Sequence, residues 1–180
     1  MTRGRCRRRE RPCGGGDAGR ARGTLRKGKA TGHEEVLARL EADGASFVVH
    51  RHAPFRSVAE ASAAGLLIDE AAKTLAVVAG GHVVLAVVPA VASLDLVALG
   101  TVLGRAEVRL CSREELAGLG GEVGTLGPFS VEGATVVVDH EVAGSPRVLC
   151  GSGRRDWTLE LSGADLVRVS GASVQHIARH

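Results

Sequence analysis

The sequence has few aromatic residues and no tyrosine, which limits how its core is built and what it can bind. Aromatic side chains make up 2% of the 180 residues, as three phenylalanines and one tryptophan. The core must therefore consist of Val, Leu and Ala, and a chain of this length buries one substantial core. Single-stranded RNA bases are commonly held on aromatic side chains. We therefore expect any nucleic acid to be held by backbone contacts or in a pocket.

Patterns for metal binding, disulfides and membrane insertion are also missing. Cys6, Cys13, Cys111 and Cys150 show no CxxC spacing, so we expect no zinc site, no other metal and no cofactor. No apolar run approaches about 18 residues, so no transmembrane helix is predicted. Reduced thiols and the lack of a signal-peptide pattern are typical of a cytoplasmic protein.

Common catalytic motifs are missing too. The sequence has no GxSxG elbow, no HExxH pair, no EF-hand loop and no set of kinase motifs. Neither Cys111 nor Cys150 lies in a pattern that lowers a thiol pKa, so both are expected to be packing residues. A side-chain nucleophile is therefore not predicted.

Charge divides the sequence into two parts. Residues 1–32 hold 11 lysines and arginines but two acidic residues, a net charge of +9, whereas residues 33–180 carry −6. The first part is rich in Arg and Gly and has few large apolar side chains, so we expect a disordered N-terminal extension. Two interpretations remain open for it, a solvated extension from a start codon set too far upstream or an arm that attracts RNA. Residues 33–180 are expected to form one folded domain.

The central pattern is the segment 73–89, KTLAVVAGGHVVLAVVP. Two apolar runs flank Gly80-Gly81, and a two-residue turn with positive φ at both positions favours glycine, so the segment predicts a β-hairpin. The runs are nearly continuous in apolar residues, which is typical of strands covered on both faces. Further strands are expected at 46–52, 107–110, 134–138, 147–150 and 157–161.

Helices are expected between these strands. Capping boxes predict helices that begin at Thr31, Ser57 and Ser112, and a further helix is expected from Ser93 to Gly100. Two closing helices are predicted over 162–166 and 172–178. Because strands and helices alternate without regular βαβ units, we predict a mixed α/β fold with a mixed, partly closed β-sheet or barrel surrounded by helices.

Three features of the sequence could carry chemistry. Lys73 stands at the head of a strand expected to be buried, where its cation either reaches water or meets an anion. The loop 120–129, GGEVGTLGPF, lets backbone groups approach a ligand closely, although a wide turn would have the same composition. Asp139-His140 follows a buried strand, which suits an active site and a solvated strand end equally.

The order and spacing of several motifs resemble the prolyl-tRNA synthetase-associated editing domain family of YbaK type, whose members are aminoacyl-tRNA deacylases. The resemblance runs from about Glu34 to Ile177. It is carried by HRHAP (50–54), AAKTLAVV (71–78), SLDL (93–96), CSREEL (111–116), GGEVGTLGPF (120–129), TVVVDHEV (135–142) and GSGRRDWTLELSGADL (151–166).

The resemblance implies roles for particular residues. The family's Lys-Thr pair falls on Lys73-Thr74, and its Gly-xxx-Pro signature falls on Gly124 to Pro128. It implies that Lys73 contacts the phosphate of the terminal adenosine or the aminoacyl end, and that the loop backbone positions substrate and attacking water. The implied catalytic positions are Lys73, Gly124 and Pro128, and the implied substrate-binding positions are Thr74, Thr125, Gly127, Asp139 and Gly153.

The resemblance also implies an activity. An editing domain of this type hydrolyses the ester of mischarged tRNA, here a proline tRNA that carries Cys or Ala, and recognises the acceptor end, with prolyl-tRNA synthetase as a partner. The family loop reads Gly-Tyr-x-x-Gly-Gly-x-Ser-Pro, and Gly121, Thr125 and Gly127 replace its tyrosine, second glycine and serine. Loss of the serine hydroxyl predicts a looser loop.

Two alternatives stay open at this point. A catalytically degenerate domain would bind tRNA ends or nucleotides without turnover. An RNA-binding protein would act through residues 1–32, with the folded domain as a scaffold.

Overall fold

The computed structural model describes residues 29–54, 58–63, 65, 67–120 and 124–180. Most of the predicted N-terminal extension lies outside this set, but residues 29–32 belong to the fold. The Thr31 N–H donates to the Ser130 carbonyl at 2.9 Å, and the Glu132 N–H donates to the Lys29 carbonyl at 2.9 Å. These contacts join residues 29–31 to the segment that follows the glycine-proline loop.

Helices and strands are interspersed along the chain, as the sequence predicted. The helices are α1 (His33–Ala42), α2 (Val58–Ala63), α3 (Leu96–Leu103), α4 (Arg113–Gly118), α5 (His140–Gly144) and α6 (Gly163–Ser170), with the 3-10 helix η1 at Ile68–Glu70. The strands are β1 (Phe47–Arg51), β2 (Ala72–Ala79), β3 (His82–Pro89), β4 (Ser93–Leu94), β5 (Val108–Leu110), β6 (Thr135–Asp139), β7 (Val148–Gly151), β8 (Trp157–Leu161), β9 (Ser173–Gln175) and β10 (Ala178–Arg179).

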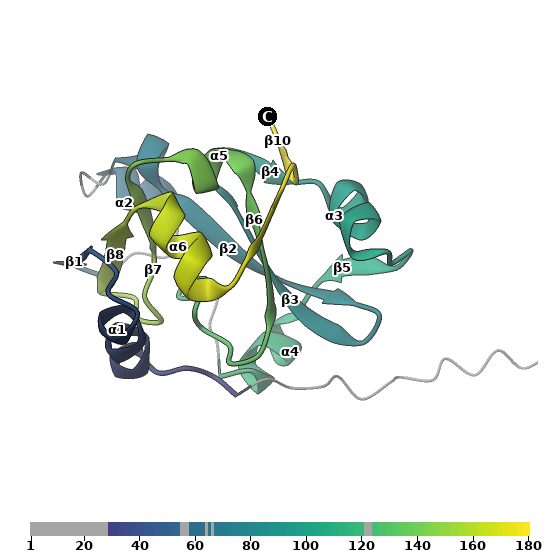
Figure 1. Ribbon diagram of the computed structural model, residues 1–180, viewed down its shortest axis with the longest axis horizontal. Coiled ribbons are helices and arrows are strands. Elements are labelled where there is room, and N and C mark those ends of the chain that lie inside the picture. The colour runs from purple at the N-terminus through teal and green to yellow at the C-terminus, as the bar shows by residue number, and fades with distance from the viewer. Residues whose placement is uncertain (1–28, 55–57, 64, 66, 121–123) are drawn as a thin grey trace, which may run out of the picture.

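The β2–β3 hairpin runs through the centre of the molecule, with α5 and α6 toward one end and α3 with β5 toward the other (Figure 1). Its turn has φ of 56° at Gly80 and 82° at Gly81, so the predicted glycine turn is confirmed. The hairpin is the centre of a sheet with the order β5-β2-β3-β6-β9, in which β3, β6 and β9 run parallel. A second sheet has the order β1-β8-β7, and β4 pairs with β10.

The mixed α/β fold class is therefore confirmed, but a barrel is not. The described strands form three separate sheets, and none of these closes on itself. The partly closed barrel of the prediction is thus not confirmed. The two larger sheets instead meet where Ala71, beside β2, forms a parallel bridge with Leu149 of β7.

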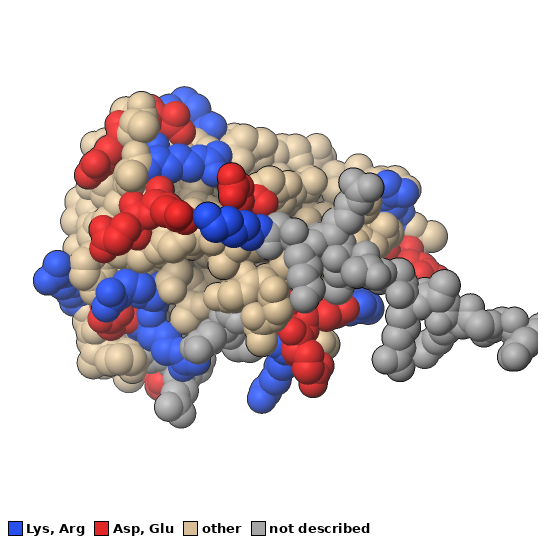
Figure 2. All heavy atoms as spheres, turned by 90° about the horizontal axis from the view of Figure 1, so that it is seen from below, with Lys and Arg blue, Asp and Glu red and all other residues tan. Residues whose placement is uncertain are grey.

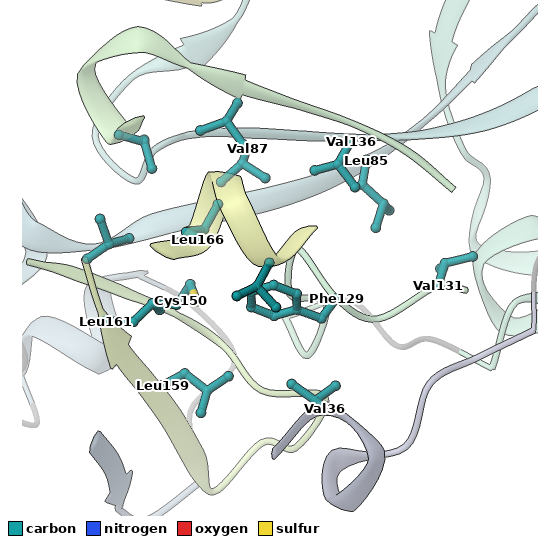
Figure 3. Close-up of a cluster of buried hydrophobic side chains, with 14 of the residues drawn as sticks. Val36, Leu85, Val87, Phe129, Val131, Val136, Cys150, Leu159, Leu161 and Leu166 are labelled. Carbon is teal, nitrogen blue, oxygen red and sulfur yellow. The ribbon is translucent and has the colours of Figure 1, made fainter. Parts of the chain in front are cut away.

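Both faces of the five-stranded sheet are covered, as the continuous apolar runs predicted. Leu85 and Val87 of β3 face a core shared with β7, β8, α1, α5 and α6, and Figure 3 shows these side chains grouped around Phe129 and Leu166. Val84, Ala86 and Val88 face a second core with Leu99 of α3 and Ile177. Alternate residues of one strand thus serve two cores, which explains why polar residues are missing from it.

Several predicted helix ends shift. α1 begins one residue later than the Thr31 box implied, because the Glu35 carboxylate accepts from the Gly32 N–H at 2.9 Å. The capping box at Ser112 is confirmed, because the Glu115 N–H donates a hydrogen bond to the Ser112 Oγ at 3.2 Å. Ser57, the third predicted cap, lies outside the described residues. α3 begins at Leu96, because Asp95 rather than Ser93 caps it. It passes through Gly100 and ends at Leu103, before Gly104 with φ of 61°.

The predicted helix over 172–178 is wrong. β9 pairs with β6 and β10 pairs with β4, so the segment is extended and completes two sheet edges. Asp139 holds it in place, because its Oδ2 accepts from the backbone N–H groups of Ile177 and Ala178, both at 2.8 Å. Long-range pairing of this kind overrides local helix propensity.

Charged side chains of both signs are interspersed over the face shown in Figure 2, without a continuous basic field. This agrees with the net negative charge of residues 33–180. Within the described part of the chain, no helix has the length and apolar character needed to cross a membrane.

Candidate functional site

A cavity of about 220 Å³ lies at the meeting point of the two larger sheets. The first residues of β2 line one wall, and the end of β7 with the start of β8 lines another. Gly124 and Leu126 from the glycine-proline loop, and Ile68 from η1, also line it. Segments far apart in the sequence therefore converge on one site, and these include two of the three chemical features found in the sequence.

Lys73 reaches this cavity as a cation without a counter-ion. Its Nζ donates to the Ala90 carbonyl at 3.1 Å, and no carboxylate of the described residues lies within ion-pair distance of it. Partial burial lowers the pKa of the Lys73 ammonium below its ordinary value. A partly desolvated ammonium with donors left over attracts an anion strongly, because solvent screens the interaction less than at an open surface.

Thr74 adds an unused hydroxyl. Thr74 is 8% exposed and lines the cavity, and its Oγ1 has no hydrogen-bond partner in the part of the chain that the structure describes. A buried hydroxyl without a partner destabilises the fold by about 1–3 kcal/mol. Such an atom in a cavity wall indicates a group that is completed by a ligand.

The glycine-proline loop forms its part of the cavity through a backbone-to-backbone contact with β7. A Cβ atom on Gly127 would collide with the carbonyl oxygen of Gly151, and a Cβ on Gly151 would collide with that of Leu126. Only glycine at both positions allows the two backbones to approach so closely. The serine of the family pattern therefore has no room at position 127 in this fold.

The described part of the loop, residues 124–129, is held by hydrogen bonds, which does not fit the expectation of a looser loop. The Gly127 N–H donates to the Ser130 Oγ at 2.7 Å, and the Gly153 N–H donates to the Thr125 carbonyl at 3.0 Å. Phe129, 2% exposed, anchors the same loop in the core. A serine hydroxyl thus holds this loop from position 130 instead of 127.

The eight positions implied by the resemblance fall into three groups. Lys73, Thr74 and Gly124 line the cavity. Thr125, Gly127, Pro128 and Gly153 do not line it but belong to the loop and hairpin that form its wall.

Asp139 lies elsewhere. It is 1% exposed, it does not line the cavity, and its Oδ1 caps α5 through the Glu141 N–H at 3.0 Å. Its Oδ2 accepts hydrogen bonds from the C-terminal segment. Asp139 is therefore neither a cavity residue nor a solvated strand end. The residue types Asp-His after a strand do not reveal this role.

The sequence reasoning missed the basic and aromatic side of the cavity. Arg154, Arg155 and Trp157 line it, as does His52. The first three belong to a hairpin with a basic tip, a signal visible in the sequence, but nothing local places that tip against Lys73. The described lining residues include no carboxylate. Their apolar members are Ala61, Ile68, Ala71, Ala72, Ala90, Leu126, Leu149 and Cys150.

No activated nucleophile is found among the described lining residues. They include no serine, and their one cysteine, Cys150, is buried. Desolvation raises the pKa of the Cys150 thiol to about 12, so it is protonated at neutral pH. Burial also raises the pKa of Cys111. The site suits water as the attacking group, with electrostatic and backbone groups to orient it.

The cavity thus brings the Lys73 ammonium, the Thr74 hydroxyl and apolar side chains together in a mixed α/β fold. Comparison with known families identifies the chain more closely: residues 52–169 match the model of the aminoacyl-tRNA editing domain, and the chain belongs to this family. No curated protein matches the sequence.

Two solved structures are similar over most of their length. One is the hypothetical protein APE2540, with a TM-score of 0.74 and 30% identity, covering 80% of this chain and 99% of that one. The other is a proposed trans-editing enzyme for prolyl tRNA synthetase, with a TM-score of 0.71 and 23% identity, covering 82% of this chain and 97% of that one. The second likeness shows the shared fold.

Restoring the family serine by Gly127→Ser is expected to damage the protein. The new side chain would collide with the Gly151 carbonyl and push the loop off β7, at a cost of about 1–3 kcal/mol. Denaturant unfolding would measure the loss. Gly144→Ala is the matched control, because nothing lies within 4 Å of its added Cβ. Equal stability of the Gly127→Ser variant and the parent protein would contradict the close approach.

The variant Thr74→Val should separate stability from binding. It removes a buried hydroxyl that has no partner and keeps the shape of the side chain, so the free energy of unfolding should stay the same or rise by about 1 kcal/mol. Ligand affinity should fall, because the hydroxyl is lost. A clear loss of stability would instead mean that Thr74 has a structural partner and is not reserved for a ligand.

Proposed function

We propose that the protein is an aminoacyl-tRNA deacylase that acts in trans on mischarged tRNA. The observation that carries the proposal is that one small cavity holds both the Lys73 ammonium and the Thr74 hydroxyl, neither of which has a charge or hydrogen-bond partner among the described side chains. An aminoacylated 3′ end presents the matching groups, an anionic phosphate on one side of the ester and an amino acid side chain on the other. Membership of the editing-domain family supports the same choice.

The reaction would proceed by direct attack of water on the ester. Water adds to the carbonyl carbon, the bond from that carbon to the ribose oxygen breaks, and the products are the free amino acid and a tRNA with its terminal hydroxyl restored. Because an aminoacyl ester is already activated, orientation of water and stabilisation of the developing oxyanion are sufficient. This role needs no thiolate or serine alkoxide, in agreement with the protonated Cys150.

Lys73 would hold the phosphate of the terminal adenosine. Its ammonium keeps donors free beyond the bond to Ala90, and a lysine is suited to phosphate as a compact charge. Gly124 lines the cavity and has φ of 87°, a left-handed conformation that favours glycine. The backbone from Gly124 to Pro128 would position the ester and the water, and Thr74 would donate to the substrate.

The acyl group is proposed to be small, with alanine or cysteine on a proline tRNA as the candidates. Several lining residues are small, among them Ala61, Ala71, Ala72 and Cys150, and the described lining residues offer no carboxylate to pair with a basic amino acid. The resemblance of the fold to a proposed trans-editing enzyme for prolyl tRNA synthetase makes proline tRNA the first choice. Prolyl-tRNA synthetase is the corresponding partner, and the cytoplasm is the corresponding location.

The catalytic unit is proposed to begin near Lys29. Residues 29–31 pair with the segment that follows the glycine-proline loop, so they support the cavity wall. The residues before Lys29 would then be dispensable for hydrolysis.

A single-turnover assay tests the proposed function. The full-length protein is mixed with tRNA charged with Cys, Ala, Ser or Pro, and release of the amino acid is followed. We expect release from one or two of the four, slowed by about 100-fold or more in Lys73→Ala, because a fixed charge at the reaction site is lost. Lys29→Ala is the matched control, because Lys29 is exposed and its Nζ lies 3.9 Å from Glu35.

Two results would count against a deacylase. Absence of release from all four tRNAs, with the protein shown to be folded, would favour a binding domain that lacks turnover. Release that Lys73→Ala leaves unchanged would contradict the assignment of the cavity as the active site.

A further inference from the structure

Trp157, the single tryptophan of the sequence, is a fixed wall of the cavity. It starts β8 opposite Arg51 of β1 in the antiparallel register. The His33 ring meets it edge-on, with ring centroids 4.3 Å apart and an interplanar angle of 85°. Two guanidinium groups lie over its ring, that of Arg51 at 4.3 Å and that of Arg154 at 5.0 Å from the centroid.

The two arginines differ in their charge partners. Arg154 forms a bidentate ion pair with Asp156: its Nε donates to Oδ1 at 2.9 Å and its Nη2 donates to Oδ2 at 2.8 Å. A neighbouring carboxylate therefore balances its charge. Arg51 is exposed, and within the described part of the chain its guanidinium contacts the Trp157 ring, with no carboxylate in ion-pair distance. Its N–H groups therefore remain available.

Stacking also prepares Arg51 for binding. A guanidinium held flat against an indole loses much of its side-chain freedom before a ligand arrives, and its planar fork of N–H groups is left directed along its own plane. That fork matches two oxygens of a phosphate. Arg51 does not itself line the cavity, but the Trp157 ring that carries its guanidinium does, so the fork lies beside the cavity.

We propose that Arg51, stacked on Trp157, binds a backbone phosphate of the RNA strand that leads into the cavity, one or two nucleotides before the terminal adenosine. This proposal rests on the proposed function, in which Lys73 holds the terminal phosphate. Two cations on different strands, β1 and β2, then set the direction in which the 3′ end enters. Arg51 is a substrate-positioning residue and Trp157 its support.

Occupation of Trp157 by guanidinium groups explains a further point. A ring that already carries two cations is a poor stacking platform for a base, so the contact with RNA is made by charge. Arg51 and Trp157 therefore contact the RNA backbone and not the bases, and specificity for the tRNA must come from other contacts.

A double-mutant cycle tests the proposal without any need for turnover. The full-length protein and Arg51→Ala are titrated with a short 5′-labelled single-stranded RNA that ends in CCA, and fluorescence anisotropy gives Kd. A second set of RNAs carries one uncharged methylphosphonate at the linkage before each of the last three nucleotides. Arg179→Ala, an exposed arginine on β10, is the control.

We expect Arg51→Ala to weaken binding about tenfold, as for other charge-assisted hydrogen bonds. One methylphosphonate should weaken binding of the parent protein by a similar factor but leave the Arg51→Ala complex unaffected. The slope of log Kd against log salt should fall by about 0.7 in the variant, the value for one phosphate of a single strand. Arg179→Ala should match the parent protein.

Several outcomes would overturn the proposal. They are equal affinity of Arg51→Ala and the parent protein, additive effects at all three linkages, or no binding of the RNA by the parent protein. If the coupling is found but no charged tRNA is hydrolysed, the Arg51 contact stands and the deacylase proposal fails. The two proposals are therefore tested separately.

Discussion

The backbone contact between Gly127 of the glycine-proline loop and Gly151 of β7 is the constraint on which the cavity depends. Neither position has room for a Cβ, so the loop lies directly on the strand that ends at the cavity. Phe129 fixes the loop in the core, and the bond from Gly153 to Thr125 ties it to the β7–β8 hairpin. Gly124 is thereby brought to the same cavity as Lys73, across an interval of the sequence that contains β3, α3 and α4.

The polar groups of the cavity are incomplete in a consistent way. Among the described residues, Lys73 has no carboxylate within ion-pair distance and the Thr74 hydroxyl has no hydrogen-bond partner. A protein optimised for stability alone would pair or remove such groups, because buried polar atoms without partners are destabilising. Here they lie together, which is the pattern expected where the missing partner is a substrate.

The sequence predicted what local physics decides. The Gly80-Gly81 turn and the Ser112 capping box follow from a few neighbouring residues, and both are found in the structure. The sequence predicted a helix over 172–178, but residues 173–175 form a strand. Its partner β6 lies more than 30 residues away in the sequence, so local patterns do not reveal the pairing. Lys73, Thr74 and Gly124 came from a family pattern, whereas Arg154 and Trp157 did not, because only the Ala71–Leu149 bridge brings their hairpin to β2. Asp139 illustrates the limit: an acid after a buried strand, it accepts hydrogen bonds from three backbone N–H groups and lies 3.2 Å from the His140 ring nitrogen, away from the cavity.

The central claim is that this cavity receives the aminoacylated 3′ end. The most direct measurement is an NMR titration of the isotope-labelled protein with a non-hydrolysable amide analogue of alanyl-adenosine 5′-phosphate. The account predicts saturable shifts at Lys73, Thr74, Gly124 and Trp157, and none in α3 or its neighbour β5 on the second core. Shifts confined to α3 and β5, or no saturable shift at any concentration, would contradict it.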